Sequence, residues 1–183
     1  MKEIEVKARV QNFDQLIEKL KELGCSLSKP LVQKDVVYLA NGVELSDVKR
    51  GNVAMRIRNS NDTCTLNLKK QLENELDCIE CETIIQNPES AHNMLIQMGY
   101  HKVSRVEKTR RTCKYKDMNI CIDEVLDLGN FIEVEKLSED ADSLKTQEEL
   151  FRFLESLGLK REDRIFKGYD TLMYGKNNPN NFY

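Results

Sequence analysis

The sequence is poor in glycine, proline and histidine and has no tryptophan, with 8, 3, 2 and 0 of these residues among 183. The few glycines never form a GxxxxGK(S/T) run, which excludes a P-loop for nucleotide phosphates. His92 and His101 fall on or just after a predicted helix, so we expect surface positions for them rather than general-base roles. Neither a GxSxG turn nor a Cys-His catalytic signature is present. Any chemistry must therefore come from other residue types.

Long apolar runs and an excess of positive charge are also missing. The longest apolar stretches, such as Val36–Ala40, are far shorter than the ~20 residues that cross a bilayer. The opening Met1–Glu5 lacks the apolar core of a secretory signal, so we expect a cytoplasmic protein. The net charge of −3 and the pI of about 5.6 provide no broad basic field for nucleic acid. We expect no membrane or nucleic-acid partner, and any anion site must be local.

Six cysteines are present, and without a secretory signal we expect free thiols. Cys78 and Cys81 have the spacing of a zinc knuckle, but the pair occurs once and has no second pair to complete a site. Both lie in a strand-like run, where residues three apart point to opposite faces of the sheet. We therefore predict neither a zinc site nor a disulfide between them.

Alternation of apolar and charged residues predicts a chain rich in β-strands. In the first strand, Ile4 and Val6 lie on one face and Glu5 and Lys7 on the other. Predicted strands span residues 2–10, 34–40, 51–58, 63–69, 77–85, 103–116, 118–126 and 131–137, and predicted helices span 13–23, 88–98 and 143–157. A last strand or short helix is predicted at residues 165–174. We expect one domain over residues 1–175 and a loose tail at 176–183.

The polar faces of these strands carry ionised residues in same-face pairs, such as Glu3 with Glu5 and Arg56 with Arg58. One interpretation is a half-exposed antiparallel sheet, which turns its polar face to solvent. The other is a closed sheet, because three amphipathic helices can cover the apolar face from outside and leave the charges inside. Burying so many ions is too costly to serve stability, so a closed sheet would hold a wet, charged ligand. Lys and Arg suit phosphate oxygens, and clustered carboxylates suit Mg²⁺ or Mn²⁺.

The charged strands carry short motifs in a fixed order. They are Glu3–Lys7 (ExExK), Ala54–Arg58 (A-M-R-I-R), Thr65–Lys69 (T-x-x-x-K), Glu80–Glu82 (E-C-E), Lys108–Arg110 (K-T-R) and Asp123–Glu135, which includes Leu128-Gly129. Together with Asp35 and Tyr38, this order resembles the CYTH superfamily over nearly the whole chain. Lys167-Gly168-Tyr169 is a looser match to the family's terminal segment, and Cys78 stands where the family often has Arg. The resemblance implies an α+β fold: an eight-stranded antiparallel tunnel with helices packed outside.

The resemblance also implies roles for the charged residues. The implied metal ligands, for Mg²⁺ or Mn²⁺, are Glu3, Glu5, Asp123, Glu133 and Glu135. The implied phosphate-binding residues are Lys7, Arg56, Arg58, Lys69, Lys108 and Arg110, with Glu80 and Glu82 in support. No residue identifies itself as a catalytic base.

The spacing is most similar to class IV adenylyl cyclases, which convert ATP to cyclic AMP and pyrophosphate. Hydrolysis of an organic or inorganic triphosphate, such as thiamine triphosphate, tripolyphosphate or a nucleoside triphosphate, is the alternative within the family. A third hypothesis is a protein that binds polyphosphate or nucleotide without turnover. The expected partner is a small triphosphate, and a homodimer is left open.

Overall fold

A computed structural model describes residues 2–138 and 142–178, and its strands form a closed antiparallel barrel. The strands are β1 (Lys2–Arg9), β2 (Leu31–Ala40), β3 (Val53–Ser60), β4 (Thr63–Gln71), β5 (Asp77–Ile85), β6 (Tyr100–Tyr115), β7 (Met118–Val125), β8 (Gly129–Ser138) and the short β9 (Arg164–Ile165). The helices are α1 (Phe13–Glu22), α2 (Pro88–Gln97), α3 (Ser143–Ser156) and α4 (Tyr169–Asn177), with 3₁₀ turns η1 (Leu45–Asp47) and η2 (Arg161–Asp163).

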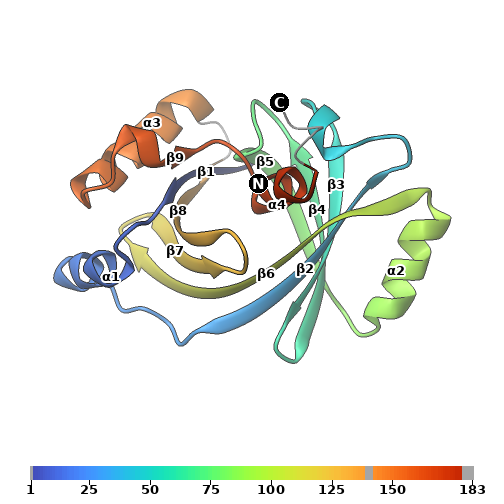
Figure 1. Ribbon diagram of the computed structural model, residues 1–183, viewed down its shortest axis with the longest axis horizontal. Helices are drawn as coiled ribbons and strands as arrows, with labels where there is room; N and C mark the ends of the chain where they lie inside the picture. Colours follow the sequence, from blue (N-terminus) through green and yellow to red (C-terminus); the bar gives the residue numbers. More distant parts are fainter. Residues whose placement is uncertain (1, 139–141, 179–183) are drawn as a thin grey trace.

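Eight strands close the barrel in the order β5-β4-β3-β2-β6-β7-β8-β1. The ring is completed by pairing of β1 with β5, where Glu3 lies opposite Cys78. β9 adds two residues to the outer edge of β1. The predicted eight-stranded antiparallel tunnel is therefore confirmed (Figure 1).

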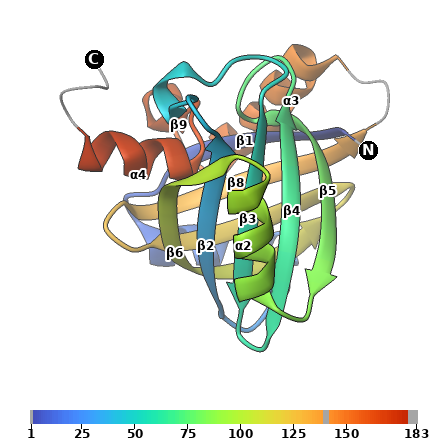
Figure 2. The same cartoon turned by 90° about the vertical axis from the view of Figure 1, so that its right-hand side faces the viewer.

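The apolar face of the barrel points outward and is covered by helices, as the amphipathic patterns predict. Ile4, Val6 and Ala8 of β1 are fully buried. Val6 and Ala8 share a core with the apolar faces of α1 and α3. On another side, α2 covers β3, β4 and β6 around Tyr38 and Leu95 (Figure 2). Because adjacent strand residues alternate, this packing turns the charged face into the barrel. Among the described residues, no helix is long and apolar enough to span a membrane.

The C-terminal part of the chain differs most from its prediction. Residues 165–174 do not form one element, because β9 ends at Ile165 and α4 begins at Tyr169. α4 continues to Asn177, so it extends into the predicted loose tail, and residues 179–183 of that tail lie outside the described residues. α4 lies within the outline of the strand ring in Figure 1 and projects beyond the strands in Figure 2. Its first residues line the barrel cavity.

Smaller differences concern the strand ends. β2 begins at Leu31, three residues before its prediction, and β6 at Tyr100. β8 begins at Gly129, two residues before its prediction, after a turn in which Asp127 has a left-handed conformation. Asn12 caps α1, since its side chain accepts a hydrogen bond from the Gln15 amide.

Candidate functional site

The inside of the barrel holds a cavity of about 450 Å³. Ligand pockets in proteins are typically ~300–1,000 Å³, so the cavity is large enough for a small molecule. Twelve of the thirteen predicted site residues line it, namely Glu3, Glu5, Lys7, Arg56, Arg58, Lys69, Glu80, Glu82, Lys108, Arg110, Glu133 and Glu135. The thirteenth, Asp123, is fully buried in the wall behind Arg110 and Tyr169. Glu82 accepts a hydrogen bond from Thr65.

Three carboxylates form a cluster on one wall of the cavity. Oxygens of Glu3, Glu5 and Glu135 all lie within 4.8 Å of one another. Strand register explains this, because Glu5 of β1 lies directly opposite Glu135 of β8. Burial, with Glu80 and Glu135 nearby, raises the pKa of Glu3 to about 8. Burial, with Glu5 and Glu133 nearby, raises the pKa of Glu135 to about 7. A divalent cation would relieve this repulsion, and carboxylate oxygens are suitable ligands for Mg²⁺ or Mn²⁺.

The other two predicted metal ligands are paired with cations instead. Glu133 accepts from Lys7 at 3.0 Å and from Arg110. Burial alone would raise the pKa of Glu133, but Lys7 and Arg110 hold it well below its usual value. Asp123 accepts from Arg110 Nε at 2.7 Å and from the Tyr169 hydroxyl at 2.9 Å. The five acids are thus divided into a mutually repelling cluster and two members of ion-pair networks.

Arg58 is held by a carboxylate that the site prediction did not include. Asp35 accepts from Arg58 Nε at 2.8 Å and from Nη2 at 2.7 Å, and the two residues are opposite in the β2–β3 register. Burial alone would raise the pKa of Asp35, but its hydrogen bonds with Arg58 lower it to about 2. Asp35 could have been found by extending the period-two pattern of β2, since it shares the inward face with Val37 and Leu39.

Arg56, Lys69 and Lys108 are less completely paired. Glu80 lies 3.0 Å from Lys69 and 3.7 Å from Arg56. The buried Nε of Arg56 has no hydrogen-bond partner among the described residues. Lys108 lies 3.7 Å from Asp123. Burial and the neighbouring Arg110 lower the pKa of Lys108 to about 8. These three side chains retain donors that a ligand in the cavity can use.

Asn67 is a second cavity residue that sequence reasoning did not assign to the site. Its Nδ2 donates to Glu80 at 3.0 Å, which leaves its buried Oδ1 without a partner among the described residues. It lies opposite Arg56 in the β3–β4 register. Its position on the inward face of β4 follows from parity with Lys69, but a neutral amide gives no charge signal in the sequence.

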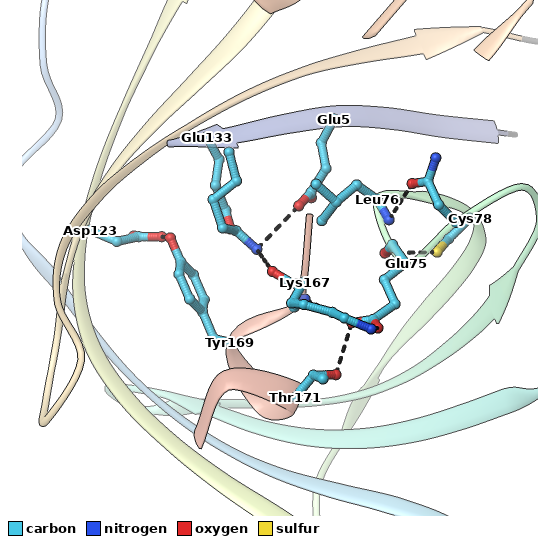
Figure 3. A network of polar contacts seen from close by, with 12 residues as sticks. Glu5, Glu75, Leu76, Cys78, Asp123, Glu133, Lys167, Tyr169 and Thr171 are labelled. Carbon is cyan, nitrogen blue, oxygen red and sulfur yellow. Dashed lines mark hydrogen bonds and ion pairs between the residues drawn. The ribbon is translucent and has the colours of Figure 1, made fainter. Parts of the chain in front are cut away.

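The predicted opposite faces of the Cys-x-x-Cys pair are confirmed. Cys78 is buried and lines the cavity, whereas Cys81 is exposed. The Cys78 thiol donates to the Glu75 carbonyl at 3.4 Å (Figure 3). Both cysteines are free thiols.

Comparison with known proteins agrees with this geometry. A family model described as the CYTH domain matches residues 1–169. A Methanocaldococcus jannaschii protein named "putative adenylate cyclase" is 28% identical over 172 residues, which cover 92% of this chain and 97% of that protein. A Pyrococcus horikoshii protein of known structure has a TM-score of 0.80 and 27% identity, covering 95% of this chain and 99% of that one.

A more distant neighbour is a Hippeastrum protein described as a "putative adenylyl cyclase" with a dominant triphosphatase activity. Its TM-score is 0.59 at 19% identity, with 91% of each chain covered. At that identity the likeness is one of fold alone.

Proposed function

Because this chain belongs to the CYTH domain family, we propose that it is a divalent-metal-dependent enzyme that acts on triphosphates. The observation that supports this most is the presence, in one cavity, of a carboxylate cluster and of cations with free donors. A bare anion would be repelled by the cluster, and a bare cation by the lysines and arginines. A metal-bound triphosphate carries both charges and suits both walls.

In this proposal each group has a distinct task. Glu3, Glu5 and Glu135 would hold the metal ion, which neutralises charge on phosphate oxygens when bound. Arg56 and Lys69 would donate charge-assisted hydrogen bonds to the phosphate chain. Both are presented by neighbouring strands of a closed barrel, so little reorganisation is needed when charge develops in the transition state. Phosphoryl and nucleotidyl transfers depend mainly on such positioning and charge stabilisation.

The first candidate reaction is cyclisation of ATP. The ribose 3′-oxygen attacks the α-phosphorus, the bond to the bridging oxygen breaks, pyrophosphate leaves, and the hydroxyl proton passes to solvent or a base. The name of the Methanocaldococcus jannaschii relative, which matches nearly end to end, supports this candidate.

The second candidate is hydrolysis, in which water attacks the terminal phosphorus of a triphosphate. It is favoured by the composition of the cavity wall. Tyr169 is the only aromatic residue among the described residues that line the cavity, and its hydroxyl and ring face already contact Asp123, Lys7 and Lys108. The described lining therefore has no aromatic ring free to stack on adenine. It does have cationic donors for the phosphate chain.

One experiment separates these candidates. The purified protein is incubated with ATP, thiamine triphosphate or tripolyphosphate, with Mg²⁺ or Mn²⁺, and cyclic AMP, pyrophosphate and phosphate are measured. Cyclic AMP with equimolar pyrophosphate supports cyclisation, and phosphate release supports hydrolysis. Glu135→Gln should reduce either activity more than ~100-fold, whereas Glu124→Gln, on the exposed face of β7, should not. Tight binding of all three compounds without any product would refute the enzymatic proposal.

A further inference from the structure

Residues 167–171 lead into α4 and form its first turn, and are here called the N-terminal segment of α4. One carboxylate accepts three hydrogen bonds from this segment. Glu75, in the connection between β4 and β5, accepts from Lys167 Nζ at 2.9 Å, from the Gly168 amide at 2.9 Å and from Thr171 Oγ1 at 2.8 Å. The Glu75 side chain is only 15% exposed. Figure 3 shows it reaching from the β4–β5 connection toward Lys167 and Thr171. A carboxylate at the start of a helix is also favoured by the helix dipole.

This attachment places Tyr169 inside the cavity, against two of the predicted phosphate-binding residues. The ring centroid lies 4.1 Å from Lys7 Nζ and 4.8 Å from Lys108 Nζ. The hydroxyl donates to Asp123, and the ring packs edge-on against Phe131. An ammonium group over an aromatic face is attracted by the negative potential of the ring. Tyr169 therefore holds two buried ammonium groups at defined positions.

The main chain of the same segment holds Lys7 from a second side. Lys7 Nζ lies 3.2 Å from the Lys167 carbonyl, 3.0 Å from Glu133 and 3.4 Å from Glu5. An ammonium group has three donors, so these contacts and the ring surround Lys7. Among the described residues, the Lys108 ammonium group has one ion pair, with Asp123 at 3.7 Å, and one ring contact, with Tyr169. Its position depends most directly on Tyr169.

From these contacts we propose that Glu75 and Tyr169 are positioning residues of the triphosphate site. Glu75 fixes the N-terminal segment of α4, and Tyr169 fixes the ammonium groups of Lys7 and Lys108 where phosphate oxygens are bound. The inference rests on the proposed function, because it assigns these ammonium groups to a triphosphate. The family match ends at Tyr169, so almost all of α4 lies beyond the matched region.

The test compares variants that remove the ring face, the hydroxyl or the attachment. Tyr169→Leu keeps an apolar side chain but loses the ring. Tyr169→Phe keeps the ring but loses the hydrogen bond to Asp123. Glu75→Gln removes the negative charge at the N-terminus of α4. Tyr174→Leu is the matched control on the same helix, where the hydroxyl donates to the exposed Glu44. For each, calorimetry gives the Kd of tripolyphosphate with and without Mg²⁺, kinetics give KM and kcat, and thermal unfolding shows that the variant is folded.

We expect Tyr169→Leu to weaken tripolyphosphate binding roughly 10-fold, within the range of a desolvated cation–aromatic contact. Tyr169→Phe should stay within about 3-fold of wild type because the ring face remains. Glu75→Gln should fall between them, and Tyr174→Leu should match wild type. A Tyr169→Leu protein that is folded and binds tripolyphosphate as tightly as wild type, or more tightly, overturns the inference, as does an equal loss in the Phe and Leu variants. The titration without Mg²⁺ measures binding without turnover, so an inactive wild type would refute the enzymatic proposal while leaving this comparison intact.

Discussion

Replacing Arg58 by Ala should destabilise the fold strongly, because it leaves a buried carboxylate without its partner. The Asp35 and Arg58 side chains are only 6% and 12% exposed, and both hydrogen bonds between them are short. Removing one member of a buried ion pair typically costs roughly 3–5 kcal/mol. The displacement of the Asp35 pKa from 3.8 to about 2 gives an independent figure. At 1.36 kcal/mol per pKa unit, it corresponds to about 2–3 kcal/mol.

The pH dependence of this loss has a definite sign. The folded-state pKa of Asp35 lies below its unfolded value, so the pair contributes its full stability above pH ~4–5 and loses it as the pH falls toward 2. The difference in unfolding free energy between wild type and Arg58→Ala should therefore be largest near pH 7. It should shrink steadily between pH 5 and pH 2.

Urea unfolding at pH 7, 4 and 2.5 measures this difference, with Lys34→Ala as the control. Lys34 forms an exposed pair with Glu107 at 3.2 Å, and such pairs contribute roughly 0–1 kcal/mol. Adding Asp35→Asn to Arg58→Ala should recover part of the loss, because no charge is then stranded. An Arg58→Ala midpoint equal to that of wild type at pH 7 would refute the reasoning.

Four further outcomes are expected. Glu135→Gln should reduce turnover more than ~100-fold with the fold intact, and undiminished activity in excess EDTA would contradict a metal requirement. Arg58→Ala should weaken ATP and tripolyphosphate alike by ~10–100-fold, with Lys restoring only part, whereas a loss confined to ATP would make Arg58 a nucleoside reader. From pH 7 to pH 9, the tripolyphosphate affinity of wild type should fall about 10-fold more than that of Lys108→Arg. The reason is that Lys108, with a pKa of about 8, loses its charge over this range while Arg keeps it. Parallel pH profiles of affinity for the two proteins would count against this. Purified protein should contain no stoichiometric zinc by elemental analysis, and the exposed Cys81 should react with a thiol reagent well before Cys78, whose pKa burial raises to about 12.

Which residues face the cavity could be predicted from the sequence, because the side-chain period of a strand is fixed at two. Val6 and Ala8 can only be buried under helices if Glu5 and Lys7 point the other way. The same reasoning applied to β2 places Asp35 on the inward face, beside the apolar Val37 and Leu39. Parity identifies a face, but it does not say which charges on that face touch.

Contacts across the barrel could not be predicted, because they depend on closure and stagger of the strands. Glu75 and Thr171 are 96 positions apart in the sequence. Their hydrogen bond can form only once β1 pairs with β5 and α4 packs at the cavity. Likewise, Glu133 and Glu135 look equivalent in the sequence. Burial acts to raise the pKa of both carboxyls. Lys7 and Arg110 outweigh burial at Glu133 and lower its pKa, whereas Glu5 adds to burial at Glu135 and raises its pKa further.

The arrangement of charges inside the cavity also predicts that a metal ion and a triphosphate strengthen each other's binding. Arg58 and Arg110 are fixed by Asp35 and Asp123, so they form a rigid basic wall even without ligand. The Glu3–Glu5–Glu135 cluster, in contrast, carries repulsion that is relieved either by protonation or by a cation. A triphosphate arriving alone adds charge of the same sign to this cluster, and a metal arriving alone meets the basic wall. Each ligand therefore lowers the cost of binding the other, and by linkage the effect is equal in both directions. It follows that Mg²⁺ should tighten tripolyphosphate binding by the same factor by which tripolyphosphate tightens Mg²⁺ binding, after correction for the complex that they form in solution.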